Sequence, residues 1–295
     1  MIRWLSIFIL MFCSAAYGGP PTHLKVYISA DMEGVGGVSS EKDQSRPGSA
    51  DYEKFRRLMT EEINAAISGA YDAGATEVLV SDSHWAGDNV DPEMLDPRAG
   101  MVRGFPRPLG MMQGIDASFD AIVFIGYHAS EDVEGAILAH LEDADKIAGV
   151  KLNGVAVPEA GFNAAIAGDV NVPVVFLSGD KAAADEAMRL LGPIDTVVVK
   201  TGSGSYSGMM LHPEKVRRMI REGVKRGVER RRQLKPYRVA HPVRLEIAFK
   251  DTFYAEIASY FRHVERPTPH SIVYTANDMA DASRFFNAIG YLDEK

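Results

Sequence analysis

The sequence predicts an α/β fold, with a mostly parallel central sheet flanked by helices and a smaller C-terminal α+β lobe. Short β-branched apolar runs alternate with helical stretches over most of the chain, which is the pattern of βαβ units. Near the end this pattern changes, because residues 243–251 alternate as a half-buried strand and residues 279–292 form an amphipathic helix pattern. We place the division near residue 200, between lobes of residues 24–200 and 201–295.

The elements of the first lobe follow in order along the chain. The segments that resemble buried strands are residues 24–31, 76–82, 120–128, 172–180 and 195–200. Helical stretches occupy residues 51–74, 159–169, 181–192 and 213–235. Gly74 suits a helix C-terminus and Pro213 a first helical turn. Between residues 83 and 119 we expect a loop rich in Gly, Pro and Asp.

The first 19 residues are typical of an export signal. Arg3 is the only charged side chain before an apolar run, and small residues follow from Ser14. The run is short for a membrane span. We therefore expect cleavage near residues 16–19 and a periplasmic or secreted protein without stable membrane insertion. An uncleaved N-terminal anchor is the alternative.

Composition excludes several classes of function. Cys13 is the only cysteine and lies within the signal, so the mature chain has no thiol for catalysis or for a cysteine zinc site. The net charge of −8 argues against nucleic acid as a partner, because a duplex-binding protein needs a basic face. The basic stretch of residues 215–235 is interleaved with glutamates, which favours a solvated or subunit-contacting helix.

Metal-type side chains occur where predicted strands end. Asp31 and Glu33 follow the first strand, His84 follows the second and His128 follows the third. The carboxyl ends of parallel strands share one edge of a sheet, where ligands bind. Two carboxylates this close in sequence repel each other unless a cation lies between them. We therefore predict a metal site at this edge, with hydrolysis as its chemistry.

Each of these residues also has a simpler interpretation when it is taken alone. The acidic pair fits a strand-end turn, His84 a surface loop and His128 a hydrogen-bonded core position. Glu159 begins a helical segment, where the helix dipole favours a carboxylate in any case. His140 has no ligand spacing, but a histidine near a metal pocket suits general acid–base work. The combination is what favours a metal site.

These blocks together resemble the M55 family of metallopeptidases, the D-aminopeptidases. The resemblance runs through S-A-D-M-E-G-V from Ser29, V-L-V-S-D-S-H ending at His84 and G-Y-H-A around His128. It continues through G-x-x-x-x-H over residues 135–140 and P-E-A-G-F-N from Pro158. The five blocks stand in the order of the family and span one peptidase unit, residues 24–292.

The resemblance implies a zinc-dependent aminopeptidase that acts on short peptides with an N-terminal D-amino acid, such as D-Ala-D-Ala. The export signal, which is unlike the cytoplasmic-type founding member of the family, adds the expectation that the enzyme is exported. The resemblance further implies that Asp31 bridges two zinc ions per subunit and that His140 serves catalysis. It also implies a ring-like homo-oligomer such as a decamer. The implied zinc ligands are Asp31, Glu33, His84, His128 and Glu159.

Some features leave the function open. Ser81 stands where the family has Asn, and the loop of residues 129–139 is longer and more acidic than the family form, which bears on substrate preference. Glu41 and Asp43 are candidates for binding the amino end of a peptide. The alternatives are a metal-dependent phosphohydrolase with its Asp at the first strand end, and a non-catalytic periplasmic dipeptide-binding protein.

Overall fold

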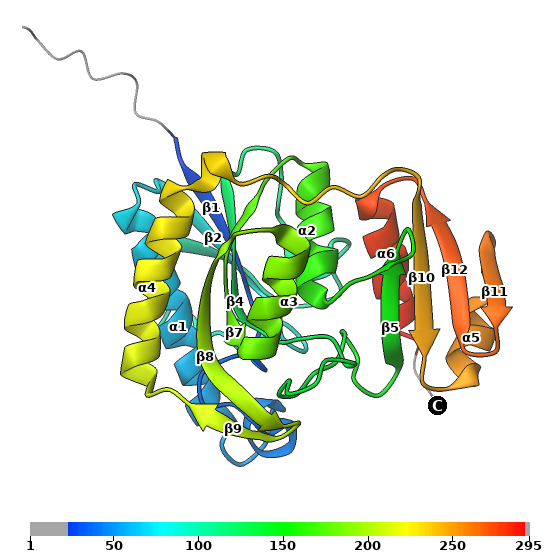
Figure 1. Cartoon of the computed structure of the whole chain (residues 1–295), viewed down its shortest axis with the longest axis horizontal. Helices are drawn as coiled ribbons and strands as arrows, with labels where there is room; N and C mark the ends of the chain where they lie inside the picture. The colour runs from blue at the N-terminus through cyan, green and yellow to red at the C-terminus, as the bar shows by residue number, and fades with distance from the viewer. Residues whose placement is uncertain (1–22, 293–295) are drawn as a thin grey trace, which may run out of the picture.

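A seven-stranded sheet forms the larger part of the molecule (Figure 1). The computed structural model describes residues 23–292, so the predicted export signal and Cys13 lie outside the described residues. The strand order is β3-β2-β1-β4-β7-β8-β9, and all neighbours are parallel except the β8–β9 hairpin. The strands are β1 (Lys25–Ala30), β2 (Glu77–Asp82), β3 (Ala99–Val102), β4 (Ala121–Tyr127), β7 (Val174–Asp180), β8 (Asp195–Gly204) and β9 (Ser207–Met210).

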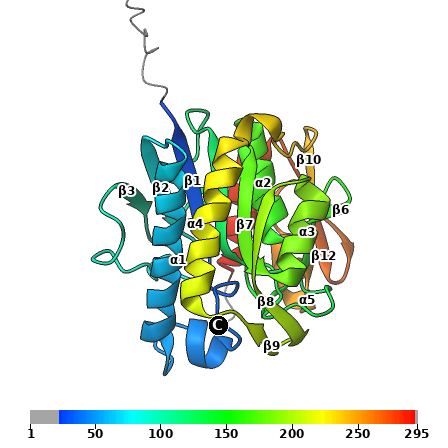
Figure 2. The same cartoon turned by 60° about the vertical axis from the view of Figure 1, so that its left-hand side comes forward.

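Helices cover both faces of this sheet, which explains why its strands are apolar on both sides. Helices α1 (Tyr52–Asp72) and α4 (Pro213–Glu229) lie side by side on one face (Figure 2), where they pack against Val26 and Ile28 of β1. On the other face, α2 (Glu159–Asp169) and α3 (Lys181–Leu191) share a core with Tyr27. The predicted α/β class with a mostly parallel sheet is confirmed.

A second sheet of five strands lies beside the first (Figure 1). Its order is β11-β12-β10-β5-β6, and its pairs are antiparallel. Helix α6 packs on α2, where the Phe162 and Phe286 rings are 5.0 Å apart, so one core joins the two sheets. The added elements are β5 (Ile147–Leu152), β6 (Val155–Ala156), β10 (Val243–Phe249), α5 (Thr252–Ala258), β11 (Val264–Thr268), β12 (Ser271–Ala276) and α6 (Met279–Gly290).

The division of the chain between the two sheets does not fall at the predicted boundary near residue 200. Strand β8 runs through that position, and α4 beyond it packs on the larger sheet. Strands β5 and β6 come from the predicted first lobe but belong to the smaller sheet, because β5 pairs with β10. The sequence carries no local signal for a pairing between segments so far apart.

Several local details follow the sequence. Gly74 has φ +92° just after the end of α1, and Pro213 is the first residue of α4. The predicted loop of residues 83–119 also contains the edge strand β3 and a 3-10 turn, Gly110–Met112. Within residues 23–292, no helix is both long enough and apolar enough to cross a membrane.

Two glycines bring the ends of β1 and β4 into close contact. The Gly34 N–H donates to Gly126 O at 2.7 Å, and the Asp31 N–H donates to Ile125 O at 2.8 Å. A Cβ atom on Gly126 would lie 2.1 Å from Asp31 O, and Gly126 has φ +70°. Only glycine fits here without strain. This contact sets the segment after β1 against the last residues of β4.

We predict that Gly126→Ala lowers the free energy of unfolding by about 1–3 kcal/mol, because the added methyl group meets backbone in a left-handed conformation. Gly149→Ala in β5 is the matched control, since nothing lies within 4 Å of the Cβ position there. Urea denaturation of both metal-free variants measures the effect. Equal midpoints for the two variants would contradict this account of the strand contact.

Candidate metal centre

The five predicted ligands converge at the carboxyl edge of the larger sheet. Asp31 directly follows β1, and Glu33 lies in the turn beyond it. His84 lies just beyond β2, His128 directly follows β4, and Glu159 is the first residue of α2. All five side chains are buried, with no residue more than 4 % exposed. The structure therefore places ionisable groups from four separate segments in one small volume.

Asp31 stands between two pairs of side chains. Its Oδ1 atom is 3.2 Å from Nδ1 of His84, and its Oδ2 atom is 3.4 Å from Nε2 of His128. Glu33 Oε2 is 2.9 Å from the same His84 nitrogen, and Glu159 Oε2 is 3.3 Å from the same His128 nitrogen. The cluster thus consists of two histidine–glutamate pairs that share one aspartate.

Backbone carbonyl groups orient both imidazoles. The Nε2–H of His84 donates to Ser45 O at 2.8 Å, which leaves Nδ1 facing the carboxylates. Nδ1 of His128 lies 3.1 Å from Ala129 O, which leaves Nε2 facing the cluster. Metal-binding histidines show this arrangement, in which the second ring nitrogen is held by a carbonyl or carboxylate.

The electrostatics of the cluster call for a cation. Burial and the neighbouring Glu33 charge raise the pKa of Asp31 to about 7. Although burial opposes it, the charge of Glu159 raises the pKa of His128 to about 10. Asp31 Oδ2 and His128 Nε2 are buried without a hydrogen-bond partner among the described residues. Imidazole and carboxylate donors are those that zinc takes in proteins, so this donor set fits zinc.

His140 lies closer to the cluster than the sequence indicated. Its ring stacks on that of His128 with centroids 4.1 Å apart and an interplanar angle of 9°. Its Nδ1–H donates to Leu138 O at 2.8 Å, so Nε2 is the atom free for proton transfer. Burial and the His128 charge lower the pKa of His140. With His128 and Glu159 it also forms a set whose ligand atoms lie within 4.8 Å of one another.

A pocket of about 560 Å³ opens above the cluster. Glu41 is among its lining residues but forms an ion pair with Arg46 at 3.3 Å, and Asp43, which bonds Ser40, does not line it. Glu142 lines the pocket as well, and sequence reasoning missed it. The only signal was its place two residues after His140 in an acidic stretch. Aromatic and apolar walls come from Trp85, Phe105, Met111, Tyr206, Phe286 and Tyr291.

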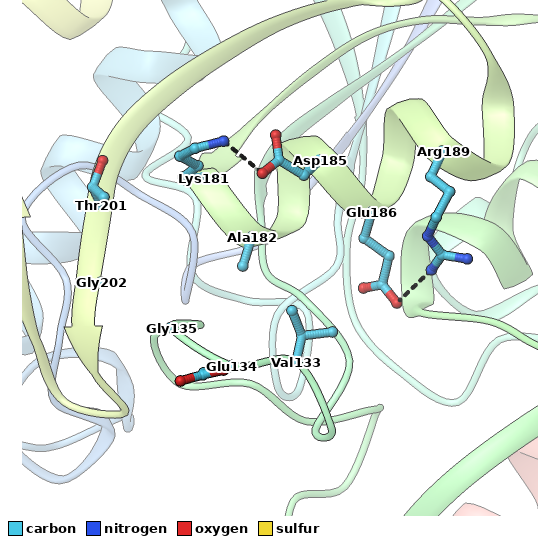
Figure 3. Close-up of a pocket in the computed structure, with 10 residues that line it drawn as sticks. All are labelled: Val133, Glu134, Gly135, Lys181, Ala182, Asp185, Glu186, Arg189, Thr201 and Gly202. Atoms are coloured by element: carbon cyan, nitrogen blue, oxygen red, sulfur yellow. Dashed lines mark hydrogen bonds and ion pairs between the residues drawn. The ribbon is translucent and has the colours of Figure 1, made fainter.

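A second pocket, of about 370 Å³, lies between α3 and the segment of residues 133–135 (Figure 3). Four of its charged groups form two ion pairs, with Lys181 2.6 Å from Asp185 and Arg189 3.6 Å from Glu186. None of the predicted site residues lines it. The pocket at the metal cluster is therefore the candidate active site.

Comparison with known proteins agrees with this geometry. The family model described as Peptidase_M55, D-aminopeptidase, matches residues 24–288. The chain belongs to the M55 peptidase family. The family and enzyme class predicted from the sequence motifs are thereby confirmed.

A sequence match and a structural match place this M55 chain beside D-aminopeptidases of Bacillus subtilis. D-aminopeptidase from Bacillus subtilis (strain 168) is 34 % identical over 263 residues, which cover 88 % of this chain and 94 % of that protein. The solved structure of the Zn-dependent D-aminopeptidase DppA from Bacillus subtilis, a self-compartmentalizing protease, superposes with a TM-score of 0.88 at 32 % identity. That match covers 91 % of this chain and 97 % of the other.

A buried lysine holds the turn that carries Glu33 in the M55 chain. The Lys200 ammonium group of β8 donates to the backbone carbonyls of Glu33, Val35 and Val38, the last at 2.6 Å. Burial lowers the pKa of Lys200 to about 8. On the same turn, the Gly36 N–H donates to Glu62 Oε1 of α1 at 2.8 Å. The turn is therefore fixed from the protein interior rather than from solvent.

Burial of the Glu62 carboxyl group makes the stability of the M55 chain depend on pH. Burial raises the pKa of Glu62 from 4.5 to about 7, so its contribution to stability is present below pH 4.5 and lost as pH rises through 7. The free energy of unfolding of the wild type should fall between pH 5 and pH 8. We predict that this fall is smaller by about 2 kcal/mol in Glu62→Gln, because the amide stays neutral. Urea denaturation of metal-free protein at both pH values measures this.

Glu53→Gln is the control for this prediction, because Glu53 lies on the same helix with its side chain 78 % exposed. The control should keep the pH dependence of the wild type. If Glu62→Gln also keeps it, the native carboxyl group of Glu62 is not held neutral.

Proposed function

We propose that this chain is a zinc-dependent D-aminopeptidase that removes the N-terminal D-amino acid from short peptides of the D-Ala-D-Ala type. The observation that carries the proposal is the position of Asp31, whose two oxygens face two separate histidine–glutamate pairs. The zinc dependence of the DppA structure, which matches nearly the whole chain, supports the same metal here.

Each pair of the cluster would hold one zinc ion. Glu33 and His84 would bind the first and His128 and Glu159 the second, with Asp31 shared between them. Zinc bound there supplies Lewis acidity toward the scissile carbonyl group and toward water. His140 Nε2 takes up a proton from the attacking water and delivers it to the leaving amine nitrogen as the C–N bond breaks. Its Nδ1–H bond to Leu138 O keeps the ring in place for both transfers.

We also propose that the protein acts outside the cytoplasm and as a homo-oligomer. The signal-type residues 1–19 support export. The description of DppA as self-compartmentalizing supports assembly, for which a decameric ring is the form to test. Tyr206 and Met209 on the β8–β9 hairpin are 73 % and 70 % exposed, and they offer an apolar surface for contacts between subunits.

The proposed activity is tested by metal analysis together with hydrolysis assays. Purified protein should contain two zinc ions per chain and should cleave D-Ala-D-Ala faster than L-Ala-L-Ala. A chelator should abolish both the zinc content and the turnover, and added zinc should restore them. Turnover that a chelator leaves unchanged would exclude a metallopeptidase mechanism.

We predict that His140→Ala lowers kcat by about 10²–10⁴-fold and retains its zinc, because the variant loses proton transfer but none of the five proposed ligands. His23→Ala is the control, since His23 precedes β1 at the opposite edge of the sheet and its side chain is 66 % exposed. Steady-state kinetics and zinc analysis of both variants measure the effect. Loss of one zinc ion in His140→Ala would show that His140 is a ligand.

A further inference from the structure

Glu142 is a strained residue in the wall of the active-site pocket. It has φ +58°, a left-handed conformation that costs a non-glycine residue about 1 kcal/mol or more. Its N–H donates to Oε1 of Glu159 at 2.7 Å, and this bond holds the backbone in place. Strain that surrounding contacts maintain is typical of functional sites.

The carboxylate of Glu142 has no partner in the described part of the chain, where only its backbone N–H makes a hydrogen bond. The buried Arg107 guanidinium, whose charge acts on Glu142, donates instead to Ser81 Oγ and Asp82 O. Glu41, the other glutamate above the cluster, is already paired with Arg46. Glu142 therefore offers this pocket a carboxylate that no described residue pairs with.

The surroundings of Glu142 favour a cation as its partner. Glu159 and Asp31 line the same pocket as Glu142. Zinc bound in the cluster would offset the charges of those two carboxylates, whereas Glu142 is not among the five proposed ligands. Glu142 is an exposed residue that borders the open space above the cluster, where a substrate enters. An ammonium group of the substrate is the cation that can pair with it there.

We propose that the Glu142 carboxylate binds the α-ammonium group of the peptide and so restricts cleavage to the first residue. This inference rests on the proposed peptidase function. Oε1 of Glu159, a proposed zinc ligand, accepts a hydrogen bond from the Glu142 N–H at 2.7 Å, so the Glu142 side chain starts next to the cluster. An ammonium group anchored there leaves room for one residue before the scissile bond.

The test compares Glu142→Gln with Asp145→Asn, which removes a charge from the same wall of the pocket. For D-Ala-D-Ala, Glu142→Gln should raise KM about 10–100-fold, the effect of losing a charge-assisted hydrogen bond, and should change kcat less than about threefold. Asp145→Asn should leave KM within about twofold of the wild type. Both variants should keep the zinc content of the wild type.

A second measurement isolates recognition of the amine. D-alaninamide and D-lactamide differ in carrying an ammonium or a hydroxyl group, and wild type should bind the amine at least about tenfold more tightly in calorimetry. Glu142→Gln should lose that preference. An unchanged KM or an unchanged preference in this variant overturns the inference. If wild-type protein hydrolyses no peptide, the proposed function fails, while the calorimetric comparison still decides the role of Glu142.

Discussion

Mutual repulsion among buried carboxylates is the constraint on which this structure depends. Asp31, Glu33 and Glu159 lie in one buried cluster, and the two imidazoles beside them leave Asp31 Oδ2 and His128 Nε2 without hydrogen-bond partners among residues 23–292. Ion pairs within the cluster therefore do not provide partners for all of its buried polar atoms. Bound zinc would remove the repulsion between the carboxylates and would coordinate the two atoms that lack a hydrogen-bond partner. The unfavourable free energy of the metal-free cluster would thus be relieved on zinc binding, which strengthens the affinity for the metal.

The rest of the fold supplies rigid backbone around this cluster. The close contact of Gly34 with Gly126 fixes the end of β1 against that of β4. The Lys200 ammonium group donates hydrogen bonds to three backbone carbonyl groups of the turn after Asp31. Its positive charge also lies near acidic residues, and it is not one of the proposed metal ligands. The proposed ligands thus come from strand ends and a helix start whose positions are set by packing, so metal binding there would require little rearrangement.

Much of the site could be predicted because parallel strands present their carboxyl ends at one edge, so residues such as Asp31 and His128 converge whatever the loops do. The pairing of β5 with β10 could not be predicted, since it joins residues about 90 positions apart with no local pattern. The role proposed for Glu142 could not be predicted from the sequence either. Its role depends on a left-handed φ and on one backbone bond to Glu159, and neither has a signature in residue type.

We propose that Asp31 separates two metal positions. A crystal structure with anomalous diffraction recorded on both sides of the zinc absorption edge tests it most directly. We expect two zinc peaks, one between Glu33 and His84 and one between His128 and Glu159, each next to a different oxygen of Asp31. A single peak, or peaks away from these side chains, would contradict it.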